Sequence, residues 1–449
     1  MMICIFGRLR PQGLSVALAT ILVSLSFFSE AADLLAAYRA ALQSDPIYQA
    51  ALSERSAGLL NRDIARSNLL PSATANAGYS QNRGDRSFNG ARPDPLNYDS
   101  KVLSVSVRQP LFSMDAMARY RQGGFQADYA EAIFAGKSQD LILRLVTAYL
   151  EVLSAIDQQR LIMAQRDALA EQQQFNSRRF EKGEGIKTDV LETRARFELA
   201  NAAVIEAQDT LDNAQRKLQA IVGRDYLVGE FALSRGLVLP LKMDTAEGWE
   251  KLALDRNPDI IARRQLVEIA AQEIKKNQAG HLPRLDLVAS YSRSLSESIV
   301  LINSETNLTT VGVQLNVPIY SGGAVSAGIQ QSAGLMSKSQ SERDDTTNAA
   351  LVEIRKQFNL VVSSRARIEA LEQAEGSAQE TLVATRKSIQ SGVRINLDLL
   401  NALQQFYTTQ RDLAQARYGY LLAYVRLHDS AGLLDEGVVG QLSTLFRAN

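Results

Sequence analysis

Gln109-Pro-Leu-Phe-Ser113 decides the fold of this 449-residue chain, because a similar stretch, Val317-Pro-Ile-Tyr-Ser321, follows 208 residues later. Three further pairs of motifs keep an offset of 209 or 212 residues. They begin at Ser44 and Arg256, at Leu70 and Leu282, and at Phe180 and Ile389. Four landmarks in register across half the chain indicate one structural unit that occurs twice.

The composition argues against an ordinary enzyme. The chain has two histidines, His281 and His428, and a single cysteine, Cys4. His281 has no metal-binding partner near it in the sequence, and no arrangement of nucleophile and base, or of paired carboxylates, rises above chance. Lysine plus arginine and aspartate plus glutamate number 49 each, so no excess of positive charge favours nucleic acid. We expect no enzyme activity, no metal, no cofactor and no nucleic-acid partner.

The first 32 residues read as a cleaved secretory signal. Arg8 and Arg10 precede an apolar run over residues 14–28, and small residues near Ala32 can serve as the cleavage site. A transmembrane anchor is the alternative, but the run is shorter than the roughly 20 residues that span a bilayer. We therefore expect export across the inner membrane.

Long helices are predicted where proline is missing. No proline occurs between Pro110 and Pro240 or after Pro318. Apolar residues recur there at spacings of three and four, which predicts helices over residues 114–181, 189–222, 324–390 and 397–431. Two stripes carry the prediction: Leu141, Leu145, Ala148, Val152 and Ile156, and then Leu413, Ala416, Tyr420, Tyr424 and Leu427.

Two short segments with a period of two precede each of the long helices. Apolar and polar residues alternate near residues 73–80, 103–108, 285–292 and 310–317, which predicts strands with one apolar face. Polar loops are expected over 83–97 and 294–306. Pro110 and Pro318 should close the strands, and Ser113 and Ser321 can cap the helices that follow.

These strands favour a membrane β-barrel over the half-buried sheet of a soluble protein. Four strands cannot close a barrel, and lipid does not tolerate an open sheet edge. The chain must therefore associate with copies of itself. Two copies would give eight strands around a filled lumen, whereas three would give twelve strands and leave a pore.

The expected organisation follows from the repeat. We divide the chain into a signal peptide (1–32), a first repeat (33–222), a linker (223–247), a second repeat (248–432) and a C-terminal tail (433–449). Each repeat should contain a helix, a β-hairpin, a long helix and a second helix. The fold class is α+β with mostly α structure.

These residues resemble the TolC family of outer-membrane channel-tunnels from residue 33 to about residue 434. The duplication, the two strand-to-helix joints and the segment Gly183-Glu-Gly-Ile-Lys-Thr-Asp-Val-Leu-Glu-Thr-Arg-Ala-Arg196 carry the resemblance. That segment looks most like family members that export proteases by type I secretion. The resemblance implies a homotrimer with a twelve-stranded barrel in outer-membrane lipid and an α-helical tunnel across the periplasm. A periplasmic adaptor and an inner-membrane ABC transporter are the implied partners.

The resemblance also implies a closed aperture at the periplasmic tip, with turns at Gly183 and Gly392. Thr188 and Asp189 match its latch positions in the first repeat. Arg394 matches the basic latch position of the second repeat, and Asp398 matches the first carboxylate of a ring.

Two positions depart from the family pattern at this tip. The latch tyrosine is Ile389, so its hydrogen bond is absent, and the second ring carboxylate is Asn401. Asp189 has a competing interpretation as a helix N-cap, because Asp189 and Glu192 have capping-box spacing. Asn396 could cap the corresponding helix of the second repeat.

Three functions remain open from the sequence. The first is the exit duct of type I protein secretion. The second is the exit duct of a drug-efflux pump, and the third is a periplasmic coiled-coil scaffold without a pore. The segment at the tip and the lack of a lipidation cysteine after the apolar run favour the first.

Overall fold

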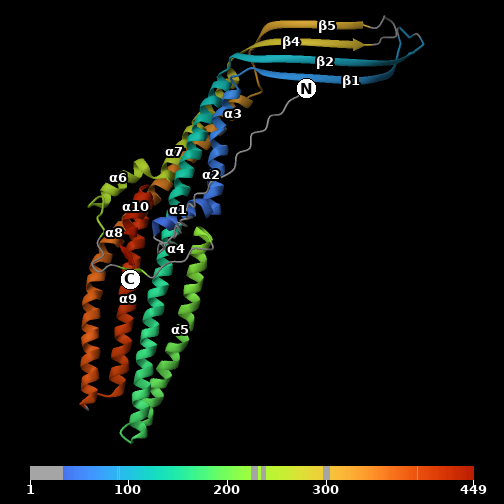
Figure 1. The fold of residues 1–449 in the computed structure, drawn as a ribbon. Helices are drawn as coiled ribbons and strands as arrows, with labels where there is room; N and C mark the ends of the chain where they lie inside the picture. The colour runs from blue at the N-terminus through green and yellow to red at the C-terminus, as the bar shows by residue number, and fades with distance from the viewer. Residues whose placement is uncertain are drawn as a thin grey trace, which may run out of the picture.

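The computed structural model describes residues 34–448 except residues 88, 91, 224–230, 234–238, 297–303 and 392. The predicted signal peptide, Gly392 and much of the predicted linker lie outside these residues. The chain forms a sheet at one end, a thick middle and two helical hairpins at the other end (Figure 1). No helix among the residues described combines the length and the apolarity that a membrane crossing requires.

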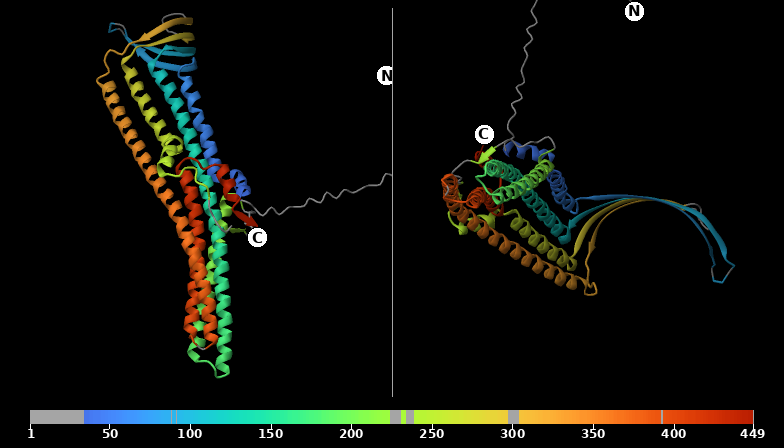
Figure 2. Two further views of the ribbon diagram at one scale, coloured as in Figure 1. Left: turned by 90° about the vertical axis from the view of Figure 1, so that its left-hand side faces the viewer. Right: turned by 90° about the horizontal axis from the view of Figure 1, so that it is seen from below.

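The sheet holds two β-hairpins in the order β1-β2-β4-β5, all antiparallel. Its strands are β1 (Ser72–Arg86), β2 (Asp94–Phe112), β4 (Arg284–Ser296) and β5 (Ser304–Asn316). Figure 2 shows the sheet from below as a curved arc rather than a closed ring. The two hairpins come from the two halves of the sequence, and β2 pairs with β4 to join them.

The strands extend beyond the predicted segments. Cross-strand pairing continues to Arg86 and Asp94 in the first hairpin and to Ser296 and Ser304 in the second. The predicted loops 83–97 and 294–306 were therefore too long. Polar residues there still satisfy backbone hydrogen bonds by pairing, although they no longer alternate with apolar ones.

Four helices confirm the periodicity prediction within two residues at each end. They are α4 (Met114–Glu181), α5 (Lys187–Val222), α8 (Ala324–Gln390) and α9 (Asn396–Ser430). Antiparallel packing pairs α4 with α5 and α8 with α9, and these two hairpins form the end of the molecule remote from the sheet (Figure 1). A helix of 68 residues such as α4 is about 100 Å long at 1.5 Å per residue.

Toward the tip, α4 and α8 pack against α5 and α9. Toward the sheet, shorter helices pack against α4 and α8 instead. On α4 lie α2 (Pro46–Leu59) and α3 (Asn61–Ser67), while α7 (Pro258–Gln278) lies between α4 and α8. The chain passes from α7 through a 3-10 turn (η1, Ala279–His281) into β4. The remaining helices, α1 (Leu34–Ser44), α6 (Ala246–Arg256) and α10 (Glu436–Ser443), surround the middle.

The C-terminal tail has structure that the sequence did not predict. Beyond α10, β6 (Phe446–Ala448) pairs with β3 (Phe231–Leu233) of the linker. Phe446 also contacts the buried ring of Tyr149, with ring centroids 5.6 Å apart. The tail therefore ties the linker to the core.

The core lies in the middle of the molecule, where both predicted stripes meet. Leu141, Leu145 and Val152 of α4 are fully buried, and Ile156 packs partly buried against them. All five residues of the α9 stripe are buried in the same cluster. Trp249, the only tryptophan, is fully buried and donates its Nε1 hydrogen to the carbonyl oxygen of Met243 at 3.0 Å.

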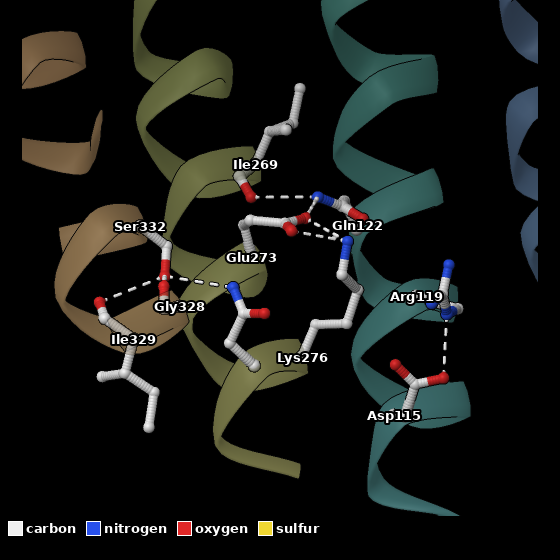
Figure 3. A network of polar contacts seen from close by, with 10 residues as sticks. Asp115, Arg119, Gln122, Ile269, Glu273, Lys276, Gly328, Ile329 and Ser332 are labelled. Atoms are coloured by element: carbon white, nitrogen blue, oxygen red, sulfur yellow. Dashed lines mark hydrogen bonds and ion pairs between the residues drawn. The ribbon is translucent and has the colours of Figure 1, made fainter. Parts of the chain in front are cut away.

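A polar network joins α4, α7 and α8 (Figure 3). The Gln122 amide of α4 donates to the Ile269 carbonyl and to Glu273 Oε2 of α7, at 3.4 and 3.0 Å. Burial raises the pKa of Glu273, but hydrogen bonds from Lys276 and Gln122 outweigh burial, and the net shift is downward. Asn277 donates to Ser332 Oγ of α8 at 3.1 Å. The network therefore fixes three helices beside the joint where strands become helices.

The joints themselves differ from each other. Ser113 caps α4 as predicted, accepting from the Ala116 amide at 3.2 Å. Pro110 lies inside β2 at a register shift instead of ending the strand. Ser321 does not cap α8. Gly322 and Gly323 both have positive φ and turn the chain before the helix begins, so Gly323, with φ of 81°, is the N-cap residue. Pro318 follows β5 as expected.

Candidate functional site: the helical tip and the two faces of the sheet

The tip is formed by two turns that end the helical hairpins. Between α4 and α5, Gly183 has φ of 77°, a left-handed conformation that glycine tolerates without strain. Arg179 fixes this turn by donating to the Glu184 carbonyl at 3.0 Å. The turn between α8 and α9 includes Gly392, which lies outside the described residues.

The four expected aperture residues lie at this tip. Thr188 is exposed and Asp189 is half-buried in the first turn of α5. Arg394 is exposed and donates to Thr385 Oγ1 of α8 at 3.4 Å. Asp398 is half-buried in the first turn of α9. Within the described part of one chain, no hydrogen bond or ion pair joins Arg394 to the side chains of the first repeat.

The capping interpretation of the tip is wrong. The N-cap residues of α5 and α9 are Ile186 and Ile395, which have extended backbones and no side-chain acceptor. Asp189 is the third residue of α5, so its carboxylate interacts favourably with the helix dipole, but it is not the N-cap residue of a capping box. Asn396 points into the protein instead of capping α9.

A buried cluster of amides at the tip was missed by the sequence analysis. It comprises Gln172 and Asn176 of α4, Thr193 of α5 and Asn396 of α9, and we call it the amide cluster. Asn176 Nδ2 donates to Thr193 Oγ1 at 2.8 Å and to Asn396 Oδ1 at 2.9 Å. Gln172 Nε2 donates to Asn396 Oδ1 and to Asn176 Oδ1, both at 3.1 Å. The cluster therefore connects the two hairpins.

The two positions that depart from the family pattern have defined contacts. Asn401 accepts a hydrogen bond from Arg196 Nη2 of α5 at 2.9 Å, which again connects α5 to α9. Ile389 packs against a small apolar core that includes Leu169 and Leu399. Each residue thus packs or bonds within the tip of its own chain.

The sheet has one apolar face and one polar face. Ala75, Val105, Tyr291 and Thr309 are neighbours across the four strands on the apolar face. Serine and threonine side chains lie opposite one another on the other face. Thr74 Oγ1 and Ser106 Oγ share a hydrogen bond of 2.8 Å there. Other members of the apolar face are Ala73, Ala77, Leu103, Val107, Leu287, Ala289, Val311, Val313 and Leu315.

Apolar residues are also exposed where the second hairpin meets its helix. Ile319 and Tyr320, beside Pro318, have 95% and 85% of their surfaces exposed in one chain. Tyr79 lies toward the loop end of the apolar face, level with Lys101 and Leu295, whereas Tyr291 lies level with Val105. Aromatic residues at both ends of an apolar band are typical of membrane barrels.

A cavity of about 520 Å³ in the middle of the molecule holds several carboxylates. Burial, and then the charges of Asp140 and Asp259, raise the pKa of Asp429 to about 6. In the described residues no group of three histidine, cysteine or acidic side chains is placed to bind a metal. The negative charge of Asp429 is therefore unfavourable in this cavity.

The tip, the two-faced sheet and the long helices define a class of outer-membrane channel proteins. The model of the family "Outer membrane efflux protein" matches residues 37–224 and 249–433. The chain belongs to this family, and like its relatives it is a protein of the outer membrane with a helical tunnel toward the periplasm.

Several individual members of this family are similar to the chain over most of its length. The alkaline protease secretion protein AprF of Pseudomonas aeruginosa is 42% identical over 90% of this chain and 85% of its own length. The proteases secretion protein PrtF of Dickeya chrysanthemi is 38% identical over 96% and 95% of the two chains. The outer membrane protein TolC of Escherichia coli is 29% identical over 94% and 87%.

The solved structures agree with the fold. The outer-membrane channel OprN superposes with a TM-score of 0.78 at 18% identity, covering 89% of each chain. The expected TolC-like fold is therefore confirmed.

Proposed function

We propose that this protein is the exit duct of a type I protein secretion system, a passive channel that its partners open at the tip. The observation that carries the proposal is the similarity to AprF and PrtF, both named for protease secretion, over nearly the whole chain. An exported protease is accordingly the proposed class of substrate. The duct itself needs no catalytic chemistry.

The assembly we propose is a homotrimer. The open four-stranded sheet supports it, because three copies supply twelve strands and a lumen wide enough for transport. The apolar face would contact lipid and the serine-rich face would line the pore. A periplasmic adaptor and an inner-membrane ABC transporter are the proposed partners at the tip.

The tip residues are proposed to form the aperture. Arg394 and Thr188 are exposed within one chain, which leaves both side chains accessible to a neighbouring copy. Asp189 would accept from the same arginine across the interface, and three copies of Asp398 would form a ring of carboxylates. An exposed ion pair is worth only about 0.2–1 kcal/mol, so such a latch depends on repetition by threefold symmetry.

Secretion by a reconstituted system tests the function. The chain would be produced in a strain that lacks its own protein of this family, together with the ABC transporter, the adaptor and the protease substrate of a protease secretion system. We expect protease activity in the medium that depends on all three components. Protease retained in the cells, with the protein correctly inserted, would contradict the proposal.

Drug efflux is the alternative, favoured by the family description, which names efflux. The same strain would then be paired with a proton-driven pump and its adaptor. Restored resistance to toxic compounds without protease export would favour this alternative. A purified protein that conducts no ions in planar bilayers under any condition would instead support a scaffold without a pore.

A further inference from the structure

The amide cluster ties the two hairpins of the tip together by buried polar groups. Thr193 is fully buried, and Asn176 and Asn396 are 6% and 7% exposed. Thr193 also donates to the Asp189 carbonyl at 2.8 Å. The cluster therefore reaches the backbone of an expected latch residue.

Separating the hairpins would break every bond that Asn396 makes in the cluster. Asn396 Oδ1 accepts from Gln172 and Asn176, and its Nδ2 donates to Thr193 Oγ1 at 3.2 Å. Buried polar groups that lose their partners are costly, because water does not replace the lost bonds until the tip has opened. The amide cluster thus opposes movement of α8 and α9 away from α4 and α5.

Asn396 is also close in sequence to the proposed gate. It is the first residue of α9, two residues after Arg394 and two before Asp398. A displacement of Asn396 would therefore move the proposed latch arginine and ring carboxylate together. The bond from Arg196 to Asn401 lies farther along α9 and would strain in the same motion.

We propose that the amide cluster is the lock that holds the tip closed within each chain, in place of the missing latch tyrosine. This inference rests on the proposed function only in taking the tip for the aperture. Opening then requires a partner that draws α9 away from α4 and offers new hydrogen bonds to the side chains of the amide cluster. Asn396 is the central residue of the lock because it accepts from α4 and donates to α5.

A lock made of neutral amides should be insensitive to salt and to pH. Asparagine, glutamine and threonine do not titrate, and neutral buried bonds are not screened by salt. Resistance to opening should therefore be the same at low and high ionic strength and between about pH 5 and pH 8. A lock made only of the exposed Arg394 would weaken as salt rises.

Conductance of the purified full-length protein in planar bilayers tests the lock. Asn396→Ala should raise the fraction of time in a high-conductance state by about tenfold or more, since several buried partners are left unpaired. Asn348→Ala is the matched control, because Asn348 is exposed on α8 and outside the amide cluster. The control should behave as the unmodified protein.

A reversible cross-link makes the test independent of folding defects. In Asn176→Cys/Asn396→Cys the thiols replace side chains that are joined by a 2.9 Å hydrogen bond from Asn176 Nδ2 to Asn396 Oδ1. Because cysteine is shorter than asparagine, a short bis-thiosulfonate reagent would bridge the two thiols, and the only cysteine of the native sequence lies in the predicted signal peptide. The bridged protein should stay closed, and a reductant that cleaves the bridge should open it. The lock is rejected if Asn396→Ala and the reduced double variant gate normally.

The outcomes separate the lock from the channel. Asp398→Asn in the same bilayers reports on the aperture through its block by divalent cations. An altered block with unaltered gating of Asn396→Ala would overturn the lock and leave the channel intact. Absence of conductance from every variant would overturn the proposed channel, and the lock with it.

Discussion

At the scale of the residue, the tip combines two kinds of polar group. Asp398 and Arg394 are accessible in one chain, whereas Asn176 and Asn396 are buried. Charged groups at an aperture control which ions pass. In our proposal, the neutral groups in the interior hold the tip closed.

Asp398 should set the divalent-cation block of the channel. In Asp398→Asn, half-block should need about tenfold more Mg²⁺, because the threefold ring loses its negative charge. Asp412→Asn on the same helix, about 20 Å from Asp398, makes the matched charge change outside the ring. Current measured against Mg²⁺ concentration decides the point, and equal block in both variants would remove Asp398 from the aperture.

Asp429 should make stability depend on pH. Its folded pKa of about 6 is above the ordinary value of 3.8, so the penalty of its charge is absent below about pH 3.8, grows as the pH rises and is complete above about pH 6. Asp429→Asn should therefore raise the free energy of unfolding by about 2–3 kcal/mol at pH 8 and leave it unchanged at pH 3. Thermal unfolding at both values measures this, with the exposed Asp209→Asn as control. A gain of equal size at both pH values would contradict the assignment.

The sequence predicted the location of the tip but not its internal bonds. Matching motifs placed Thr188, Asp189, Arg394 and Asp398 together, since each lies next to a turn that ends a helix. The bond from Asn176 to Asn396 joins residues 220 positions apart, on helices whose mutual rotation no local pattern specifies.

At the scale of the element, helix limits were predictable because the physics that sets them is local. Proline and glycine mark the ends of α4 and α8, and uninterrupted periodicity marks their length. Caps were less predictable. Gly323 displaces Ser321 from the start of α8 because a left-handed turn comes first, and the sequence alone does not show that conformation.

The two faces of the sheet should respond differently to the same charge. Val105 lies on the apolar face and Ser104 on the polar face of β2. Val105→Arg should cost about 2–4 kcal/mol in a membrane, whereas Ser104→Arg should insert normally and shift ion selectivity toward anions. Protein recovered in outer-membrane fractions and reversal potentials in bilayers measure the two effects. Equal loss of insertion would show that the polar face does not line a wet lumen.

At the scale of the whole molecule, the sheet is incomplete in one chain. β1 and β5 each pair with a single neighbour, so each has an edge with unpaired backbone groups. Lipid offers these groups no hydrogen bonds. The strand number, the curvature of the sheet in Figure 2 and the apolar face therefore support the proposal that other copies complete the ring.

Cross-linking should reveal that ring as a trimer. Within one chain β1 and β5 are separated by three strand spacings, about 14 Å, which is too far for a disulfide. Thr74→Cys on β1 would be combined in turn with cysteine at each even-numbered position from 306 to 314, which share one face of β5. Bonds can then form only between copies, and the correct register should yield a covalent species with three times the mass of one chain.

The mass of the largest cross-linked product distinguishes a trimeric barrel from a dimeric one. Three copies give twelve strands, whereas two give eight and a lumen filled by side chains. Dimers as the largest product would therefore remove the pore, and with it the proposed duct, even if the chain inserts in the outer membrane. Cross-linked trimers should also be tested for closure by the amide cluster, by comparing their conductance with and without Asn396→Ala. The two tests address different bonds: the proposed amide lock lies inside each chain, whereas completion of the sheet, like the proposed Arg394 latch, needs bonds between chains.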